Sequence, residues 1–122
     1  MNPEVEEKIR IICRSARDYL ETNPLGFGVH QPFPRGWCGD ASRYLKEQLL
    51  RDLGIEARIC TGDMYEDPAL TRNNHAWLEY GDYFIDITAD QFNPEGYENP
   101  AVMVTTDSNF HCLFKFRKTV TE

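Results

Sequence analysis

The sequence predicts one α+β domain in which N-terminal helices pack on an antiparallel β-sheet. Apolar residues recur at helical spacing in two segments before residue 54, and from residue 55 onward the apolar period becomes two, as in strands. The chain has 122 residues, of which 41% are hydrophobic, and this is enough to bury one core. We therefore expect a single domain over residues 1–122.

The first predicted helix covers residues 2–22. Asn2 can cap it, and Pro3 follows in the first turn, where a missing N–H is tolerated. Its apolar stripe is Val5, Ile9, Ile12, Cys13, Ala16, Tyr19 and Leu20. Residues 23–36 are rich in Pro and Gly and predict an ordered loop.

The second predicted helix begins at Cys38. Gly54 can take the left-handed conformation that ends a helix. The apolar stripe between them is Cys38, Ala41, Leu45, Leu49 and Leu53. The thiol of Cys38 therefore lies in the first turn, where backbone N–H groups lack helical partners.

Strands are predicted after this helix. Residues 55–60 alternate as a half-buried strand does, and the polar residues 61–74 predict a loop. Residues 75–80 and 83–88 are rich in β-branched and aromatic side chains and flank Gly81-Asp82, a hairpin signal. A loop at 91–100 and strands at 101–105 and 110–117 complete the expected sheet.

The hairpin brings a histidine and a carboxylate together. A two-residue turn at Gly81-Asp82 pairs Tyr80 with Tyr83 and places His75 and Asp86 on one face as diagonal neighbours, roughly 7–8 Å apart at the backbone. Side chains can bridge that distance. A hydrogen bond between His75 and Asp86 is therefore expected.

Three residues then suit nucleophilic catalysis. A cysteine in the first turn of a helix next to an imidazolium has a lowered thiol pKa, and a carboxylate on the other ring nitrogen orients the histidine. We assign these roles to Cys38, His75 and Asp86. The Cys38 backbone N–H and one further donor would hold an oxyanion; Gln31 and Trp37 are candidates for that donor, and Trp77 is a candidate substrate contact.

Other interpretations of these residues remain open. Cys38 could be the first core residue of its helix, because buried free cysteines are common. Cys13 and Cys112 are expected to be structural, Cys60 is unassigned, and His30 and His111 look ordinary. The four cysteines are widely spaced without a C-x-x-C, so we expect reduced thiols, no metal and no cofactor.

Three ordered blocks resemble the transglutaminase-like superfamily. They are Gly36-Trp37-Cys38-Gly39-Asp40-Ala41-Ser42 with its continuation through residues 49–62, His75-Ala76-Trp77-Leu78-Glu79, and Phe84-Ile85-Asp86-Ile87-Thr88. The resemblance implies a papain-like α+β core with a Cys-His-Asp triad. It also implies acyl transfer on amide bonds: peptide cleavage, glutamine deamidation or crosslinking, or removal of a glycan from asparagine.

Net charge and hydropathy indicate which classes of binding partner are disfavoured. The 13 basic and 20 acidic residues leave a net charge of -7, which disfavours nucleic acid and anionic lipid surfaces. No apolar run approaches a membrane span and no secretory signal begins the chain, so a cytoplasmic location is expected. We expect a small cysteine hydrolase acting on peptide or protein amides. The alternatives are a glutamine deamidase or transglutaminase-type acyltransferase, including a toxin or effector, and an inactive binding module of the same fold.

Overall fold

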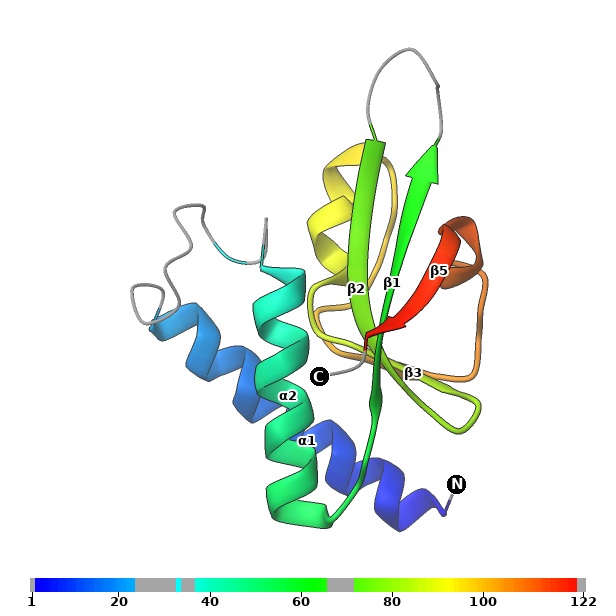
Figure 1. Cartoon of the computed structure of the whole chain (residues 1–122). Coiled ribbons are helices and arrows are strands. Elements are labelled where there is room, and N and C mark those ends of the chain that lie inside the picture. Colours follow the sequence, from blue (N-terminus) through cyan, green and yellow to red (C-terminus); the bar gives the residue numbers. More distant parts are fainter. Residues whose placement is uncertain (1, 24–32, 34–36, 66–71, 121–122) are drawn as a thin grey trace.

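Figure 1 shows a computed structural model of the chain, which has an α+β fold. The structure describes residues 2–23, 33, 37–65 and 72–120. Its helices are α1 (Pro3–Thr22) and α2 (Cys38–Leu53), with short 3-10 helices η2 (Ala89–Glu95) and η3 (His111–Leu113). The strands are β1 (Arg58–Tyr65), β2 (Arg72–Tyr80), β3 (Tyr83–Asp86), β4 (Met103–Thr105) and β5 (Lys115–Val120). The predicted α+β class is confirmed.

Both long helices begin and end where their capping residues predict. The Asn2 side chain accepts the backbone N–H of Glu4 at 2.7 Å and caps α1. Gly54 has a φ of 67° after α2, and its N–H donates to the carbonyl of Leu50. Tyr19, expected on the apolar stripe of α1, instead remains 45% exposed and stacks on Tyr44 of α2.

The five strands form one antiparallel sheet in the order β4-β3-β2-β1-β5. Tyr80 pairs with Tyr83 across Gly81-Asp82, so the predicted two-residue turn is confirmed. The loop predicted at 61–74 was wrong in part, since β1 and β2 pair from Arg58↔Glu79 to Tyr65↔Arg72. The backbone N–H and C=O groups of this polar segment pair with the neighbouring strands. The alternation of apolar residues cannot predict such pairing, because it depends on backbone groups.

The C-terminal part also differs from the prediction. A single strand at 110–117 was expected, but η3 comes first and β5 starts at Lys115. Phe110 and Phe114, which flank η3, are still buried, as they would be on one face of a strand. Cys112, expected to be structural, is exposed. The loop predicted at 91–100 begins as the helical turn η2.

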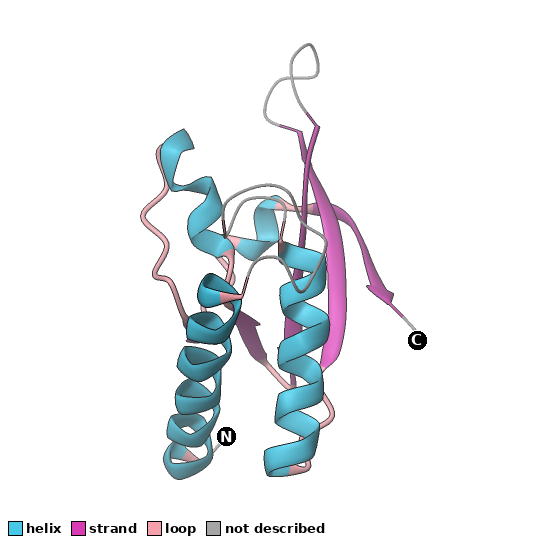
Figure 2. Ribbon diagram, turned by 90° about the vertical axis from the view of Figure 1, so that its left-hand side faces the viewer, coloured by secondary structure: helices cyan, strands magenta, loops and turns pink. Residues whose placement is uncertain are grey.

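The sheet has two differently covered faces. In Figure 2, α1 and α2 lie together on one side of the sheet. We call the aliphatic cluster beneath them the helix-side core; it includes Leu20, Leu45, Leu49, Ile59, Leu78, Ile85 and Val104. Strand residues next to these face the other way, into a cluster that we call the aromatic core. The core also includes residues of η2 and the residues that flank η3; its members are Cys60, Trp77, Ala89, Phe92, Met103, Phe110 and Phe114. Within the described residues, no helix has the length and apolar character needed to cross a membrane.

Candidate active site

Cys38 is the first residue of α2. The residue before it, Trp37, is the N-cap but makes no side-chain capping bond, because an indole N–H can donate but not accept; its ring is buried and packs edge-on against Phe33. The first-turn N–H groups therefore receive no capping bond from the Trp37 side chain. The Cys38 thiol is half-buried and hydrogen-bonded to the side chain of His75. The start of α2 thus presents a thiol to the end of the sheet that carries His75.

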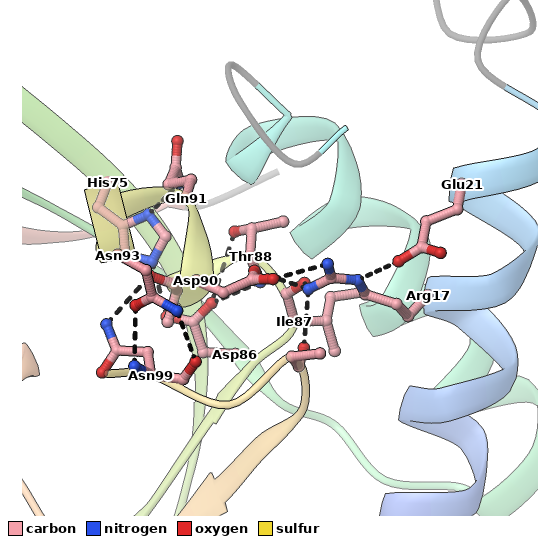
Figure 3. A network of polar contacts seen from close by, with 12 residues as sticks. Arg17, Glu21, His75, Asp86, Ile87, Thr88, Asp90, Gln91, Asn93 and Asn99 are labelled. Atoms are coloured by element: carbon pink, nitrogen blue, oxygen red, sulfur yellow. Dashed lines mark hydrogen bonds and ion pairs between the residues drawn. The ribbon is translucent and has the colours of Figure 1, made fainter. Parts of the chain in front are cut away.

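His75 lies on β2 with 1% of its surface exposed, among aromatic rings of the aromatic core. Its Nε2 is 2.6 Å from Oδ2 of Asp86, and its Nδ1 is 3.0 Å from Nε2 of Gln91 (Figure 3). Because Asp86 occupies Nε2, Nδ1 faces both the Gln91 amide and the Cys38 thiol. The contact of His75 with Asp86 is the one predicted from the hairpin register.

Asp86 is the last residue of β3 and is 2% exposed. Its Oδ2 accepts from His75 and, at 2.7 Å, from Nε2 of His111. Its Oδ1 accepts the backbone N–H of Thr88 at 3.0 Å and has a longer contact of 3.5 Å with the Thr88 hydroxyl. Burial raises the pKa of this carboxyl, but the charge of His75 and hydrogen bonds from both histidines hold the pKa well below its usual range. Asp86 is therefore an ionised, fully partnered carboxylate.

The pKa of the Cys38 thiol is lowered and the pKa of the His75 imidazole is raised, so each shift favours the charged form of its own group. Burial raises the pKa of Cys38, but the hydrogen bond and charge of His75, with a backbone hydrogen bond at Ala76, outweigh it and leave the pKa below its ordinary value. Burial lowers the pKa of His75, whereas the charge and hydrogen bond of Asp86 and the Cys38 thiol raise it to about 9. These shifts favour a thiolate–imidazolium pair at neutral pH.

The other buried cysteines behave in the opposite way. Burial raises the pKa of the Cys13 thiol to about 12. Burial, with a smaller contribution from Glu79, raises that of Cys60 to about 11. The charges of Arg10 and Arg14 near Cys13, and of Arg58 near Cys60, do not outweigh burial, whereas the hydrogen bond and charge of His75 do so at Cys38.

A buried arginine fixes the segment that carries Gln91. Arg17 of α1 donates from its two Nη atoms to the two oxygens of Asp90 at 2.7 Å each. It also donates to the carbonyls of Ile87 and Ala101 at 3.0 Å, and to Glu21 at 2.6 Å (Figure 3). This network ties η2, and with it Gln91, to the first helix. Sequence reasoning missed Arg17, although a lone arginine between Ala16 and Leu20 on an apolar stripe was a signal.

The structure brings Cys38, His75 and Asp86 together, and it also places Gln91 beside them. The indoles of Trp37 and Trp77 are fully buried; that of Trp77 donates to Glu79 at 2.9 Å and packs on the His75 ring. Their contact with substrate stays a prediction. Gln31 and His30 lie outside the described residues.

His111 was expected to be ordinary, and this was wrong. It is fully buried and bound to Asp86, because the helical turn η3 directs it inward where a strand was expected. Phe110 before it and Phe114 after it were the available signal, since both belong to a buried cluster.

The cluster of His75, Asp86 and His111 has ligand types that bind metals, with donor atoms within 4.8 Å of one another. Both histidine nitrogens lie at 2.6 and 2.7 Å from one carboxylate oxygen. Ligands around a tetrahedral zinc ion, bound at about 2.0–2.1 Å, are separated from each other by roughly 3.3 Å. The spacing is therefore that of hydrogen bonds.

The candidate site thus combines one residue from a helix start and two from adjacent strands. They occur in the chain in the order cysteine, histidine, aspartate, which is the order in the family that the sequence resembles. Comparison of the chain with protein-family models, with curated proteins and with solved structures found no match.

Proposed function

We propose that the chain is a cysteine-dependent hydrolase that cleaves peptide or protein amide bonds through Cys38, His75 and Asp86. One observation carries the proposal: a thiol in the first turn of a helix has its pKa lowered by a buried imidazole whose Nε2 lies 2.6 Å from a carboxylate. A cysteine that only fills space has a raised pKa, as Cys13 does, whereas that of Cys38 is lowered. The sign of the shift favours a nucleophile over a core residue.

The reaction follows from the positions of the protons. The Cys38 thiolate attacks the amide carbonyl carbon, a C–S bond forms, and the carbonyl electrons move to oxygen. His75 gives its Nδ1 proton to the leaving amine, the C–N bond breaks, and a thioester remains. A water molecule then loses a proton to His75 Nδ1 and attacks the thioester, which releases the acid and restores the thiolate. Asp86 stays ionised throughout and holds the ring by Nε2.

The oxyanion needs donors during both halves of this reaction. The first-turn N–H groups of α2 supply one kind. The carboxamide of Gln91 is a candidate for the second, since it lies 3.0 Å from His75 Nδ1. When Nδ1 carries a proton, it can no longer accept from the Gln91 amide, so that N–H becomes available to the oxyanion.

Glutamine deamidation and transamidation share the first half of this reaction. A glutamine side chain would acylate Cys38 with release of ammonia, and water or an amine would then take the acyl group. The same three residues act in each case. The proposed placement in the transglutaminase-like superfamily, with a papain-like core, rests on the three sequence blocks and is supported by the cysteine on a helix facing a histidine and an aspartate on adjacent strands.

The first test is alkylation with a limiting amount of iodoacetamide at about pH 6, where ordinary thiols are almost fully protonated. Mass mapping should find Cys38 modified ahead of Cys112, which is exposed and serves as the internal reference. Cys38→Ser should abolish the fast reaction, and Cys112→Ser should leave it. Preferential modification of Cys112, with Cys38 untouched, would contradict the proposal.

Activity is then sought with a mixture of unfolded proteins and peptides. Mass spectrometry separates new termini from deamidated glutamines and from crosslinked pairs. New termini that depend on Cys38 support hydrolysis. Deamidated glutamines or crosslinks that depend on Cys38 would support deamidation or transamidation in place of hydrolysis. A reactive Cys38 without any product would support the inactive binding module.

A further inference from the structure

His111 has an environment that its neighbours in the sequence do not predict. Its ring is fully buried and lies parallel to Phe84, with centroids 4.9 Å apart and planes at 1°. Trp77 and Phe110 cover it at 5.0 and 5.1 Å. An imidazole enclosed by aromatic rings is costly to bury unless its nitrogens find partners. The partner it finds is Asp86, the carboxylate of the candidate site.

The two nitrogens of His111 differ in a way that fixes where its proton lies. Nε2 is 2.7 Å from Asp86 Oδ2, whereas Nδ1 is buried with no hydrogen-bond partner in the described structure. A doubly protonated ring would leave an N–H donor unsatisfied in an apolar enclosure. The neutral ring with its proton on Nε2 therefore fits the site, and it can only donate to Asp86.

This distinguishes the two histidines that share one carboxylate oxygen. His75 presents Nδ1 to Cys38 and Gln91 and can exchange a proton there. His111 has no such outlet. Among the described residues, Glu79 is held by the Trp77 indole, Cys60 belongs to the same cluster, and Cys13 is close enough to Asp86 for its charge to raise the thiol pKa. Asp86 thus receives three N–H donors, from His75, His111 and Thr88, and one of them belongs to a ring that does not take part in proton transfer.

We propose that His111 is a positioning residue for the reaction proposed above, on which this inference rests: its Nε2–H fixes Asp86 Oδ2 and limits the basicity of that carboxylate. A carboxylate with several donors is a weaker base, so it stabilises the His75 imidazolium without drawing its proton too strongly. The Nδ1 proton of His75 then remains available to the leaving group. Without the His111 donor, Asp86 would hold the imidazolium more tightly and be less firmly placed.

The test compares His111→Phe with His111→Gln. Phenylalanine keeps a flat ring over Phe84 but removes the N–H, whereas the glutamine amide can reach the position of the imidazole Nε2. Phe110→Leu changes the packing of the same cluster without touching Asp86 and is the matched control. Nitrogen-15 NMR of the His75 ring against pH follows the loss of the imidazolium proton without any substrate. Thiolate absorbance, with the signal of Cys38→Ser subtracted, shows whether the thiolate is present at neutral pH.

We expect His111→Phe to move the loss of the imidazolium proton upward by about one pH unit, and to reduce turnover about 10- to 100-fold. His111→Gln should stay near the wild type, and Phe110→Leu should lower stability without moving the titration. A folded His111→Phe protein with the wild-type titration would overturn the inference. So would a His111→Gln protein that behaves as His111→Phe does.

A second measurement uses the wild type and tests the same inference if His111→Phe does not fold. Nitrogen-15 NMR of the wild type at about pH 7 should show the His111 proton on Nε2 and none on Nδ1, because Nε2 lies 2.7 Å from Asp86 Oδ2 and Nδ1 has no partner among the described residues. A proton on Nδ1 would overturn the inference, as would loss of the Nε2–H signals of both histidines on addition of one equivalent of zinc. Absence of a neutral-pH thiolate in the wild type would instead defeat the proposed function, and the tautomer of His111 would still be read separately.

Discussion

The two faces of the sheet are built from different chemistry. The helix-side core consists of aliphatic and small side chains, among them the fully buried Leu49 and Leu78, together with the indole of Trp37. The aromatic core surrounds a charged group, because His75, Asp86 and His111 are buried among its rings. An aliphatic core needs only shape, whereas buried charges need every hydrogen bond satisfied. The helix-side core therefore mainly stabilises the fold, and the aromatic core holds the hydrogen-bonded His75 and Asp86 in fixed positions.

The largest effect is expected from Asp86→Asn in the aromatic core. The amide group introduces a donor where two N–H groups already point, so it favours the wrong tautomer of His75. Turnover should fall by about 10³–10⁴-fold, by analogy with a serine protease triad. Each donor left unsatisfied should also cost about 1–3 kcal/mol of unfolding free energy.

Asp82→Asn is the matched control, because Asp82 lies exposed in the hairpin turn. Steady-state kinetics and urea unfolding measure the two consequences. The contacts of Asp86 with both histidines and Thr88 lead us to expect a less stable fold for Asp86→Asn. Equal losses from both variants would show that the wrong carboxylate has been assigned.

Leu49→Ala tests the helix-side core. It should lower the unfolding free energy by about 2–5 kcal/mol, since the site is fully enclosed and a cavity remains. The titration of the Cys38 thiolate should not move. Leu50→Ala is the control, because this neighbouring side chain is 49% exposed and should matter little. A shift of the thiolate titration in Leu49→Ala would show that the two faces are coupled.

Gln91→Ala removes the carboxamide next to His75 Nδ1. If Gln91 supplies an oxyanion donor, kcat should fall about 10²-fold with little change in KM, because the lost interaction belongs to the transition state. Gln91→Glu has nearly the same shape but opposes both the thiolate and the oxyanion, so it should be at least as damaging. Wild-type turnover in Gln91→Glu would remove Gln91 from the proposed mechanism.

Arg17→Lys breaks the connection between α1 and η2. Lysine cannot reproduce the paired contacts to Asp90 or reach the carbonyls of Ile87 and Ala101 at the same time. The unfolding free energy should fall by about 1–3 kcal/mol, the range for hydrogen bonds to charged groups. Arg14→Lys is the control, since Arg14 contacts Glu7 at the exposed surface. Equal effects at both positions would mean that the buried network contributes nothing specific.

Local signals account for what the sequence could predict. Asn2, Gly54 and the apolar stripes define the helices within a few residues of each boundary. The Gly81-Asp82 turn sets the register of β2 and β3, and this register alone places His75 near Asp86. These inferences succeed because each depends on residues close together in the chain.

Contacts between distant residues were not predictable in this way. Arg17 and Asp90 are 73 residues apart, and His111 and Asp86 are 25 apart. No periodicity joins such pairs, and their polar side chains look solvent-exposed when each segment is considered alone. The extension of β1 through residues 61–65 has the same cause, because its partners are backbone groups of β2 and β5.

The smallest effect, about tenfold per pH unit, concerns the activity at high pH. The pKa of His75 is raised to about 9, so the imidazolium of the active pair persists to that pH. Above it the pair loses the proton needed by the leaving group, and kcat/KM should fall about tenfold per unit. Activity that declines from about pH 6.5, the value for an unperturbed histidine, would show that Asp86 does not hold the imidazolium.

Stability against pH separates the two members of the pair. A raised His75 pKa contributes stability that is present below about pH 6.5 and is lost as pH rises through the folded value, whereas the lowered Cys38 pKa contributes with the opposite sign. In the wild type the two contributions oppose each other, so the unfolding free energy should be nearly level between about pH 6.5 and about pH 9. In Cys38→Ser only the histidine contribution remains, and stability should fall across this range, by at most about 1.4 kcal/mol per unit.

Urea unfolding at several pH values measures these slopes. Leu49→Ala should lower the wild-type curve by a constant amount, because the helix-side core contains nothing that titrates with the pair. His75→Ala should remove the fall seen in Cys38→Ser when the two changes are combined. Parallel slopes in the wild type and in Cys38→Ser would mean that folding does not lower the pKa of the Cys38 thiol, and the thiolate–imidazolium pair on which the proposed chemistry depends would not exist.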